Sequence, residues 1–208
     1  MGVLKNNEEM KQEMAKLLYK IDAIKFGLFK LSSGRVSPYY VDLRIVPSFP
    51  HAFRQICGLY GDFIKNKIGL ESFDRIAGVP IAGIPFASQI AYNLEKPFLY
   101  VRKGVRLHGR QRRVEGLLVS GDRVLLIDDL VTSGLTLKKT AESVRAEGGV
   151  AKMAVAFLDR EEGGKENLAK KGIKLHSLLR ISEIANILND IGAIDQESLK
   201  TILKQVKK

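Results

Sequence analysis

Apolar residues along the chain follow two alternating patterns. Short, unbroken runs of Val, Ile and Leu are typical of strands covered on both faces, and the segment from Arg123 to Ile127 is one of them. Longer segments repeat apolar residues at helical spacing, as Leu137, Ala141 and Val144 do between Leu135 and Glu147. Alternation of the two patterns predicts βαβ crossovers, and hence an α/β fold with a central, mostly parallel sheet flanked by helices.

The two patterns assign most of the chain to helices and strands. Strands are predicted at Arg75 to Gly78, Phe98 to Val101, Arg123 to Ile127, Lys152 to Leu158 and Lys174 to Leu178. Helices are predicted at Asn7 to Lys25, Ala52 to Lys67, Gly83 to Leu94, Leu135 to Glu147, Glu162 to Lys171, Ile181 to Asn189 and Gln196 to Lys207. The segment from Phe29 to Asp42 resembles a hairpin that turns at Ser33 and Gly34. We expect an N-terminal helix and hairpin hood, residues 1–50, and a core of residues 51–208, together one compact unit.

Composition narrows the class of protein. A chain of 208 residues with 45% hydrophobic content can bury a full core. The single cysteine, Cys57, excludes an internal disulfide framework and fits a small buried hydrophobe better than a nucleophile. No apolar run approaches the roughly 20 residues of a membrane-spanning helix, and the segment from Met1 to Lys20 is charged rather than signal-like. We therefore expect a cytoplasmic protein without a membrane partner.

The net charge of +11 calls for an anionic partner, either nucleic acid or a strongly anionic small substrate. The stretch from Arg102 to Arg113 holds six cations and no acid, beside His108 and between glycines. Its cations are Arg102, Lys103, Arg106, Arg110, Arg112 and Arg113. Because so much of the excess lies in one glycine-bounded loop, we expect small anionic substrates rather than nucleic acid.

Two adjacent acids, Asp128 and Asp129, follow the predicted strand that ends at Ile127. In open α/β sheets, ligands bind at the carboxyl ends of the strands. The next segment, Thr132 to Thr136, opens a helix, and the unpaired N–H groups of a helix start attract anions. Carboxylates repel phosphate but accept hydrogen bonds from ribose hydroxyls or bind Mg²⁺, so the pattern indicates a phosphorylated sugar. The alternative is a solvated strand end followed by an N-capped turn.

The full string from Val124 to Thr136 resembles the phosphoribosyl-pyrophosphate (PRPP) signature of type I phosphoribosyltransferases. That signature has four hydrophobic residues, two acids, two hydrophobic residues and Thr-x-Gly-x-Thr. The resemblance implies that Asp128 and Asp129 serve the ribose hydroxyls and the charged transition state. It also implies a 5′-phosphate site made by Thr132, Ser133, Gly134, Leu135 and Thr136.

Two further loops fit the same resemblance. The segment from Gly78 to Pro85, read alone, is a turn, but beside the acid motif it resembles the family's pyrophosphate loop, with Ala82 and Gly83 in contact with the ligand. The segment from Arg102 to Gly109 resembles the lid of orotate phosphoribosyltransferases, Arg-Lys-x-x-Lys-x-His-Gly, with Arg106 in place of the second lysine. The resemblance implies a symmetric dimer in which Arg102, Lys103, Arg106 and His108 close over pyrophosphate in the neighbouring subunit. The alternative is a basic loop that binds anions loosely.

The hairpin narrows the resemblance to orotate enzymes, which show Phe-x-Leu-x-Ser-Gly-x-x-Ser-Pro followed by aromatic residues. The chain has these in register as Phe29, Leu31, Ser33, Gly34, Ser37, Pro38, Tyr39 and Tyr40. It departs from many members at Ser32 and Ala82, where they carry lysine. The resemblance implies an orotate site made by Tyr39, Tyr40, Thr132 and Arg160, of which Arg160 grips the carboxylate. If the resemblance is set aside, the two tyrosines are interpreted as strand residues of the core and Arg160 as a surface residue.

The implied reaction is a glycosyltransferase step of pyrimidine and UMP biosynthesis, in which orotate and PRPP give orotidine 5′-monophosphate and pyrophosphate. Mg²⁺ is the implied cofactor, held mainly by PRPP with Asp128 and Asp129 as candidate ligands. Two other functions stay open from the sequence alone. One is a phosphoribosyltransferase for another base, which Ser32, Ala82 and Arg106 make credible, and the other is a non-catalytic PRPP sensor that binds nucleic acid.

Overall fold

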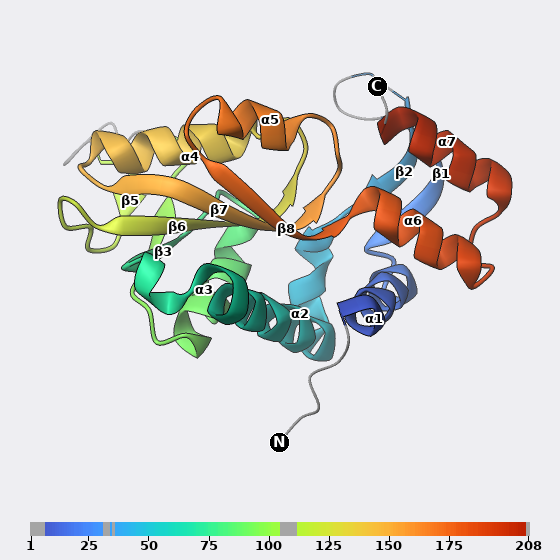
Figure 1. Ribbon diagram of the computed structural model, residues 1–208, viewed down its shortest axis with the longest axis horizontal. Helices are drawn as coiled ribbons and strands as arrows, with labels where there is room; N and C mark the ends of the chain where they lie inside the picture. Colours follow the sequence, from blue (N-terminus) through green and yellow to red (C-terminus); the bar gives the residue numbers. More distant parts are fainter. Residues whose placement is uncertain (1–6, 31–33, 35, 105–111, 207–208) are drawn as a thin grey trace.

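A computed structural model describes residues 7–30, 34, 36–104 and 112–206, and it is built around a six-stranded sheet (Figure 1). The strand order is β5-β4-β3-β6-β7-β8, and every neighbouring pair is parallel except β4 and β5. The strands are β3 (Arg75–Gly78), β4 (Phe98–Val101), β5 (Val114–Glu115), β6 (Arg123–Val131), β7 (Val150–Asp159) and β8 (Lys174–Arg180). The predicted α/β fold with a mostly parallel central sheet is confirmed.

Helices cover both faces of this sheet (Figure 1). Helices α2 (Pro50–Phe63) and α3 (Gly83–Asn93) lie on one face, and α4 (Leu135–Ala146) and α5 (Gly164–Ala169) lie on the other. Along β6, Leu125 and Ile127 belong to the apolar cluster of the α2 and α3 face, whereas Leu126 belongs to the cluster of the α4 and α5 face. This strand is apolar on both sides because a parallel sheet is covered on both sides.

A second, two-stranded sheet is assembled from the start of the chain and lies beside its last helices (Figure 1). Strands β1 (Ile24–Lys30) and β2 (Val36–Val41) pair antiparallel, after α1 (Asn7–Lys20). The C-terminal helices α6 (Ile181–Asp190) and α7 (Gln196–Val206) pack against α1 and β2. One apolar cluster joins all of these elements to the α2 and α3 face of the main sheet.

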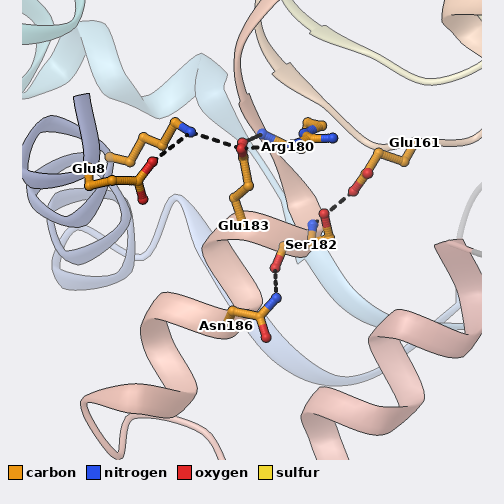
Figure 2. A network of polar contacts seen from close by, with 7 residues as sticks. Glu8, Glu161, Arg180, Ser182, Glu183 and Asn186 are labelled. Atoms are coloured by element: carbon orange, nitrogen blue, oxygen red, sulfur yellow. Dashed lines mark hydrogen bonds and ion pairs between the residues drawn. The ribbon is translucent and has the colours of Figure 1, made fainter.

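Ion pairs also connect helix α1, near the start of the chain, to helix α6, near its end (Figure 2). The Nζ atom of Lys11 on α1 lies 2.9 Å from Oε1 of Glu183 on α6 and 3.2 Å from Oε1 of Glu8. Arg180 completes the group, with its Nη2 atom 3.0 Å from the same Glu183 oxygen. The pairing with Lys11 and Arg180 outweighs burial, so the pKa of Glu183 lies below its ordinary value.

Several predicted boundaries were wrong, for physical reasons that the structure shows. The first helix ends at Lys20 instead of Lys25, because β1 already starts at Ile24 and pairs with β2. The helix predicted from Glu162 begins at Gly164, after the left-handed Gly163. The second helix passes at Phe63 into a π-helical turn, η2 (Ile64–Ile68).

The strand predicted to end at Ile127 continues to Val131, so both acids lie inside β6. They are held there by the partner strand, since Asp128 pairs with Ala156 and Leu130 with Leu158 of β7. The short strand β5 and the 3₁₀ helices η1 (Leu43–Ser48) and η3 (Leu70–Ser72) were not predicted.

Two smaller expectations concern burial and membranes. Cys57 is fully buried, as expected, and burial raises the pKa of its thiol to about 12. Such a thiol is protonated at neutral pH and therefore a poor nucleophile. Within residues 7–30, 34, 36–104 and 112–206, none of the helices combines the length and apolar character that crossing a membrane requires.

Candidate active site

A cavity of about 470 Å³ opens at the carboxyl edge of the main sheet. Its walls come from four stretches of chain that are far apart in the sequence: Val41–Arg44, Pro80–Ala82, Asp128–Leu137 and Arg160. The fold brings them together because parallel strands β3, β6 and β7 end at the same edge. A wider cleft of about 1390 Å³ lies beside the cavity, between the hairpin and β8, and shares Thr132 and Ser133 with it.

The two acids of β6 form the floor of the cavity. Asp128 is 7% exposed and Asp129 is 6% exposed. Burial raises the pKa of both carboxyl groups, and the neighbouring charge of Asp129 raises that of Asp128 further. The backbone N–H of Asp129 donates to Oδ1 of Asp128 at 3.0 Å, and the hydroxyl of the buried Tyr60 donates to the backbone carbonyl of Asp128. The pair is thus rigidly placed and would gain most from a cation or from hydroxyl donors in the cavity.

Helix α3 begins against the backbone of these acids. A Cβ atom added to Gly83 would lie 2.6 Å from the carbonyl oxygen of Ile127 and 2.9 Å from Cα of Asp128. Only glycine allows this approach, because real Cβ atoms do not come so close to backbone. The predicted pyrophosphate loop, Gly78 to Pro85, therefore lies beside the acids, and its residues Pro80, Ile81 and Ala82 line the cavity.

The predicted phosphate loop, Thr132 to Thr136, lines the cavity between β6 and α4. Gly134 precedes the helix with a φ of 78°, and the first-turn N–H groups of α4 follow it. Helix α5 supports the loop from behind, since Nδ2 of Asn167 donates to the carbonyl oxygen of Ser133 at 3.1 Å. A Cβ atom on Gly164 would lie 2.5 Å from the carbonyl oxygen of Thr132. Sequence reasoning missed both supporting residues, although two consecutive glycines after Arg160 were a signal for close packing.

Arg160 lines the cavity at the end of β7, as expected, and two side chains hold it. Its Nε atom donates to the hydroxyl of Tyr39 at 3.3 Å, and its guanidinium carbon lies 4.9 Å from the centre of the Tyr39 ring. Its Nη2 atom lies 2.9 Å from Oε1 of Glu162, and both side chains are 11% exposed. Tyr39 itself is fully buried and does not line the cavity, so the structure places it behind Arg160.

The turn that carries Arg160 is anchored on both sides. Oδ1 of Asp159 accepts the backbone N–H of Glu161 at 2.8 Å. Oε2 of Glu161 accepts the backbone N–H of Ser182 at 2.9 Å, which joins the turn to the start of α6 (Figure 2). Glu161 has a φ of 56°, in the left-handed region that non-glycine residues rarely adopt. The turn is therefore fixed by side-chain bonds rather than by regular structure.

The hairpin contributes a pair of charges that sequence reasoning missed. Oδ1 of Asp42 accepts from Nε of Arg44 at 2.6 Å, and Oδ2 accepts from Nη2 at 2.7 Å. The hydroxyl of Tyr40 accepts a further bond from Nη2 at 3.2 Å. Asp42 and Arg44 line the cavity, whereas Tyr40, predicted to contact orotate, does not. The available signal was the Asp-x-Arg step directly after the aromatic residues of the hairpin.

The cationic stretch from Arg102 to Arg113, which contains the predicted lid, begins after β4 and ends before the neighbouring strand β5. The backbone N–H of Arg102 donates to the carbonyl oxygen of Arg113 at 2.9 Å, and Val101 pairs with Val114 across β4 and β5. Neither Arg102 nor the exposed Lys103 lines the cavity of this chain. Arg106 and His108 lie outside the described residues.

The residues present fit a hard cation only in part. Across the described part of the chain, no three His, Cys, Asp or Glu side chains are grouped to hold a metal ion. Asp128 and Asp129 offer carboxylate oxygens at the cavity floor, and Mg²⁺ commonly takes one or two carboxylates together with substrate phosphates and water. The donor set therefore suits a Mg²⁺ ion that arrives with a phosphorylated ligand.

This fold and this cavity define a class of protein that binds a phosphorylated sugar at the edge of a parallel sheet. The family model described as phosphoribosyl transferase domain matches residues 51–187. That range starts one residue after the start of α2 and reaches into α6, so it contains the whole six-stranded sheet.

The names of individual relatives indicate a narrower class of protein than the family model does. An orotate phosphoribosyltransferase of Cenarchaeum symbiosum (strain A) is 40% identical over 185 residues, which are 89% of this chain and 92% of the relative. The crystal structure of orotate phosphoribosyltransferase from Aeropyrum pernix superposes with a TM-score of 0.72 at 32% identity, over 86% of this chain and 99% of that one. The UMP synthase of Leishmania donovani gives a TM-score of 0.83 at 30% identity over 95% of this chain, which spans 42% of that protein. The chain therefore belongs to the phosphoribosyltransferase family, and within it to the orotate phosphoribosyltransferases.

Proposed function

We propose that this enzyme uses Mg²⁺ and PRPP to convert orotate to orotidine 5′-monophosphate and pyrophosphate. One observation carries the proposal: a single cavity gathers two buried carboxylates, a phosphate-type loop at a helix start, and Arg160. A phosphorylated ribose needs the first two, and a carboxylated base needs the third. The relatives that bear the orotate phosphoribosyltransferase name support the choice of base.

The roles of the core residues follow from their positions. The first-turn N–H groups of α4 and the Thr132 to Thr136 loop would bind the 5′-phosphate. Asp128 and Asp129 would accept hydrogen bonds from the ribose hydroxyls and balance the positive charge that develops at the anomeric carbon. The bond from this carbon to a pyrophosphate oxygen would break as the bond to the orotate ring nitrogen forms, and that nitrogen would lose its proton to the departing pyrophosphate or to water. The protein supplies positioning and charge, without a covalent nucleophile.

Mg²⁺ would be held mainly by PRPP oxygens, with Asp128 and Asp129 as its protein ligands, and it would neutralise charge on the leaving pyrophosphate. The base would enter from the wider cleft, which meets the cavity at Thr132. Arg160 would bind the orotate carboxylate through its guanidinium fork. Tyr39 would act through Arg160, to which it is hydrogen-bonded.

We further propose a hood of residues 1–50 above a core of residues 51–208. The start of the family match at residue 51 supports that boundary. The packing of α6 and α7 against α1 and β2 indicates that the end of the chain completes the hood. The hood would supply the hairpin wall of the cavity.

A homodimer with a shared lid is also part of the proposal. Arg102 and Lys103 belong to the lid but do not line the cavity of their own chain, which supports a role in a neighbouring site. Mixing an inactive lid variant, His108→Ala, with an inactive pocket variant, Asp129→Asn, should restore some activity. Proven heterodimers without recovery would contradict the shared lid.

The direct test follows orotate absorbance in the presence of PRPP and Mg²⁺, with uracil, adenine, guanine and hypoxanthine tested in parallel by product detection. Consumption of orotate that depends on PRPP is the expected result. Turnover of another base, with orotate untouched, would contradict the proposed base. Activity on none of them, with PRPP still bound, would leave a PRPP-binding protein without transferase function.

A further inference from the structure

The cavity wall formed by Val41–Arg44, where the hairpin passes into η1, is called the hairpin wall here, and it carries an exposed cation, Arg44. Its side chain is 65% exposed, and it lines the same cavity as Asp128, Asp129 and the Pro80–Ala82 segment. Two of the described residues that line this cavity are cationic, Arg44 and Arg160. Among the described lining residues, these two guanidinium groups supply the positive charge that would balance a strongly anionic ligand.

The second of these cations, Arg160, is already engaged. Glu162 and Tyr39 hold it in a largely buried position at the end of β7. A guanidinium in that position is suited to a planar carboxylate that exchanges with, or adds to, its existing partners. Arg44 is therefore the exposed guanidinium that remains for phosphate groups.

Arg44 is held in a fixed orientation and keeps donors for a ligand. Asp42 and Tyr40 accept from its Nε and Nη2 atoms, but among the described residues none accepts from Nη1. A guanidinium has five N–H donors in a planar fork, so both N–H groups of Nη1 are left for a ligand. Because the orientation is set beforehand, little side-chain entropy is lost when an anion binds.

The loop from Gly78 to Pro85, which lines the same cavity through Pro80–Ala82, lacks a side-chain cation. The segment from Gly78 to Pro85 reads Gly-Val-Pro-Ile-Ala-Gly-Ile-Pro, which offers backbone N–H groups and no positive charge. A pyrophosphate group beside this loop would also face the floor of acids. Burial raises the pKa of Asp129, and the charge of Arg44 opposes this shift, so the two groups are close enough to interact.

We propose that Arg44 binds the pyrophosphate group of PRPP from the hood side of the cavity, and that Asp42 and Tyr40 position it. This inference rests on the proposed function, because it takes PRPP as the ligand. It assigns the hood a role in binding the leaving group, in addition to its place beside the base.

The experiment compares Arg44→Gln with Arg54→Gln, which removes an exposed arginine of α2 that does not line the cavity. Calorimetry with Mg²⁺ measures binding of PRPP, inorganic pyrophosphate and ribose 5-phosphate to each full-length variant. We expect Arg44→Gln to weaken PRPP and pyrophosphate about tenfold and ribose 5-phosphate less than about twofold, since an arginine–phosphate bond is charge-assisted. Arg44→Lys should fall between Arg44→Gln and the wild type, and Arg54→Gln should bind all three like the wild type.

Unchanged pyrophosphate binding in Arg44→Gln would overturn the proposal. An equal loss for ribose 5-phosphate would overturn it as well, because it would show a general distortion of the cavity. Failure of the proposed function is distinguishable, since these measurements contain no orotate. A wild type that binds PRPP without consuming orotate would contradict the transferase assignment and leave the Arg44 result intact, whereas a wild type that does not bind PRPP would overturn both.

Discussion

The two walls of the cavity hold their charged groups in opposite ways. The sheet wall places Asp128 and Asp129 inside a packed core, 7% and 6% exposed, where burial raises the pKa of both. The hairpin wall pairs the half-buried Asp42 with the exposed Arg44, whose guanidinium lowers the pKa of Asp42. An unpaired buried carboxylate costs folding free energy, whereas an exposed pair costs little. The carboxyl groups of the sheet wall would thus be stabilised by a cationic or hydrogen-bonding ligand, whereas Asp42 of the hairpin wall already has a partner in Arg44.

The same contrast holds for the backbone. The sheet wall is fixed by strand pairing on both sides of β6 and by the close approach of Gly83. The hairpin wall has backbone pairing only between β1 and β2, and it is otherwise held by side-chain bonds and by packing against helices from the end of the chain. We infer that the sheet wall carries the chemistry that tolerates no displacement, and that the hairpin wall adjusts binding.

The largest expected effect is on turnover. Asp129→Asn should lower kcat at least about tenfold, roughly 1.4 kcal/mol in the barrier, because the variant loses negative charge next to the anomeric carbon. The same change on the hairpin wall, Asp42→Asn, should lower kcat by less than about threefold, because it acts through Arg44 on binding. Steady-state kinetics at saturating orotate and PRPP measures both. Equal losses in the two variants would break the division between the walls.

The second effect is on stability. Gly83→Ala should lower the free energy of unfolding by about 1–3 kcal/mol, since its Cβ atom would meet backbone of β6. Gly58→Ala is the matched control, because nothing lies within 4 Å of a Cβ atom at this position in α2, and it should stabilise by about 0.5–1 kcal/mol. Urea unfolding of both variants gives the comparison. A Gly83→Ala protein as stable as the wild type would show that the backbone of the sheet wall can shift to accommodate the added Cβ atom.

A smaller effect concerns the base. Tyr39→Phe keeps the buried ring under Arg160 but removes the hydroxyl that accepts from its Nε atom. A lost hydrogen bond of about 0.5–1.5 kcal/mol should raise KM for orotate about threefold to tenfold, with KM for PRPP nearly unchanged. Tyr92→Phe, at an 81% exposed position, is the control and should change neither constant. A rise in both KM values for Tyr39→Phe would indicate general disorder instead of a role through Arg160.

The smallest effect depends on pH. Burial raises the pKa of Asp128 in the folded state, so its ionised form costs stability above that pKa. Asp128→Asn should therefore raise Tm at pH 8, and the gain should shrink as pH falls through the folded pKa and vanish below the unfolded value of about 3.9. Asp42 has a lowered pKa, so Asp42→Asn should slightly lower Tm at pH 8, a loss that disappears in acid. Scanning calorimetry across pH tests both signs, and a lower Tm for Asp128→Asn at pH 8 would contradict the cost of burying this carboxylate in the sheet wall.

Local patterns predicted much of this architecture. The bounds of β3 and β4 match their predictions, because unbroken apolar runs between turn residues have few other interpretations. The acids and the Thr132 to Thr136 loop were placed correctly on one cavity wall, because chemistry that is continuous in sequence stays continuous in space. The end of β6 was missed because two acids interrupt its apolar run, while pairing with β7 keeps them in the strand.

The alternation of strands and helices, the acid pair and the loop that follows it can be inferred from the chain alone, since each depends on neighbouring residues. Three features became visible in the folded molecule: Asp42 and Arg44 line the same cavity as those acids, Tyr39 lies behind Arg160, and α6 and α7 pack against the hood. These contacts join segments more than a hundred residues apart or on different sheets. Their energy comes from burial and charge pairing across the fold, which no local pattern encodes.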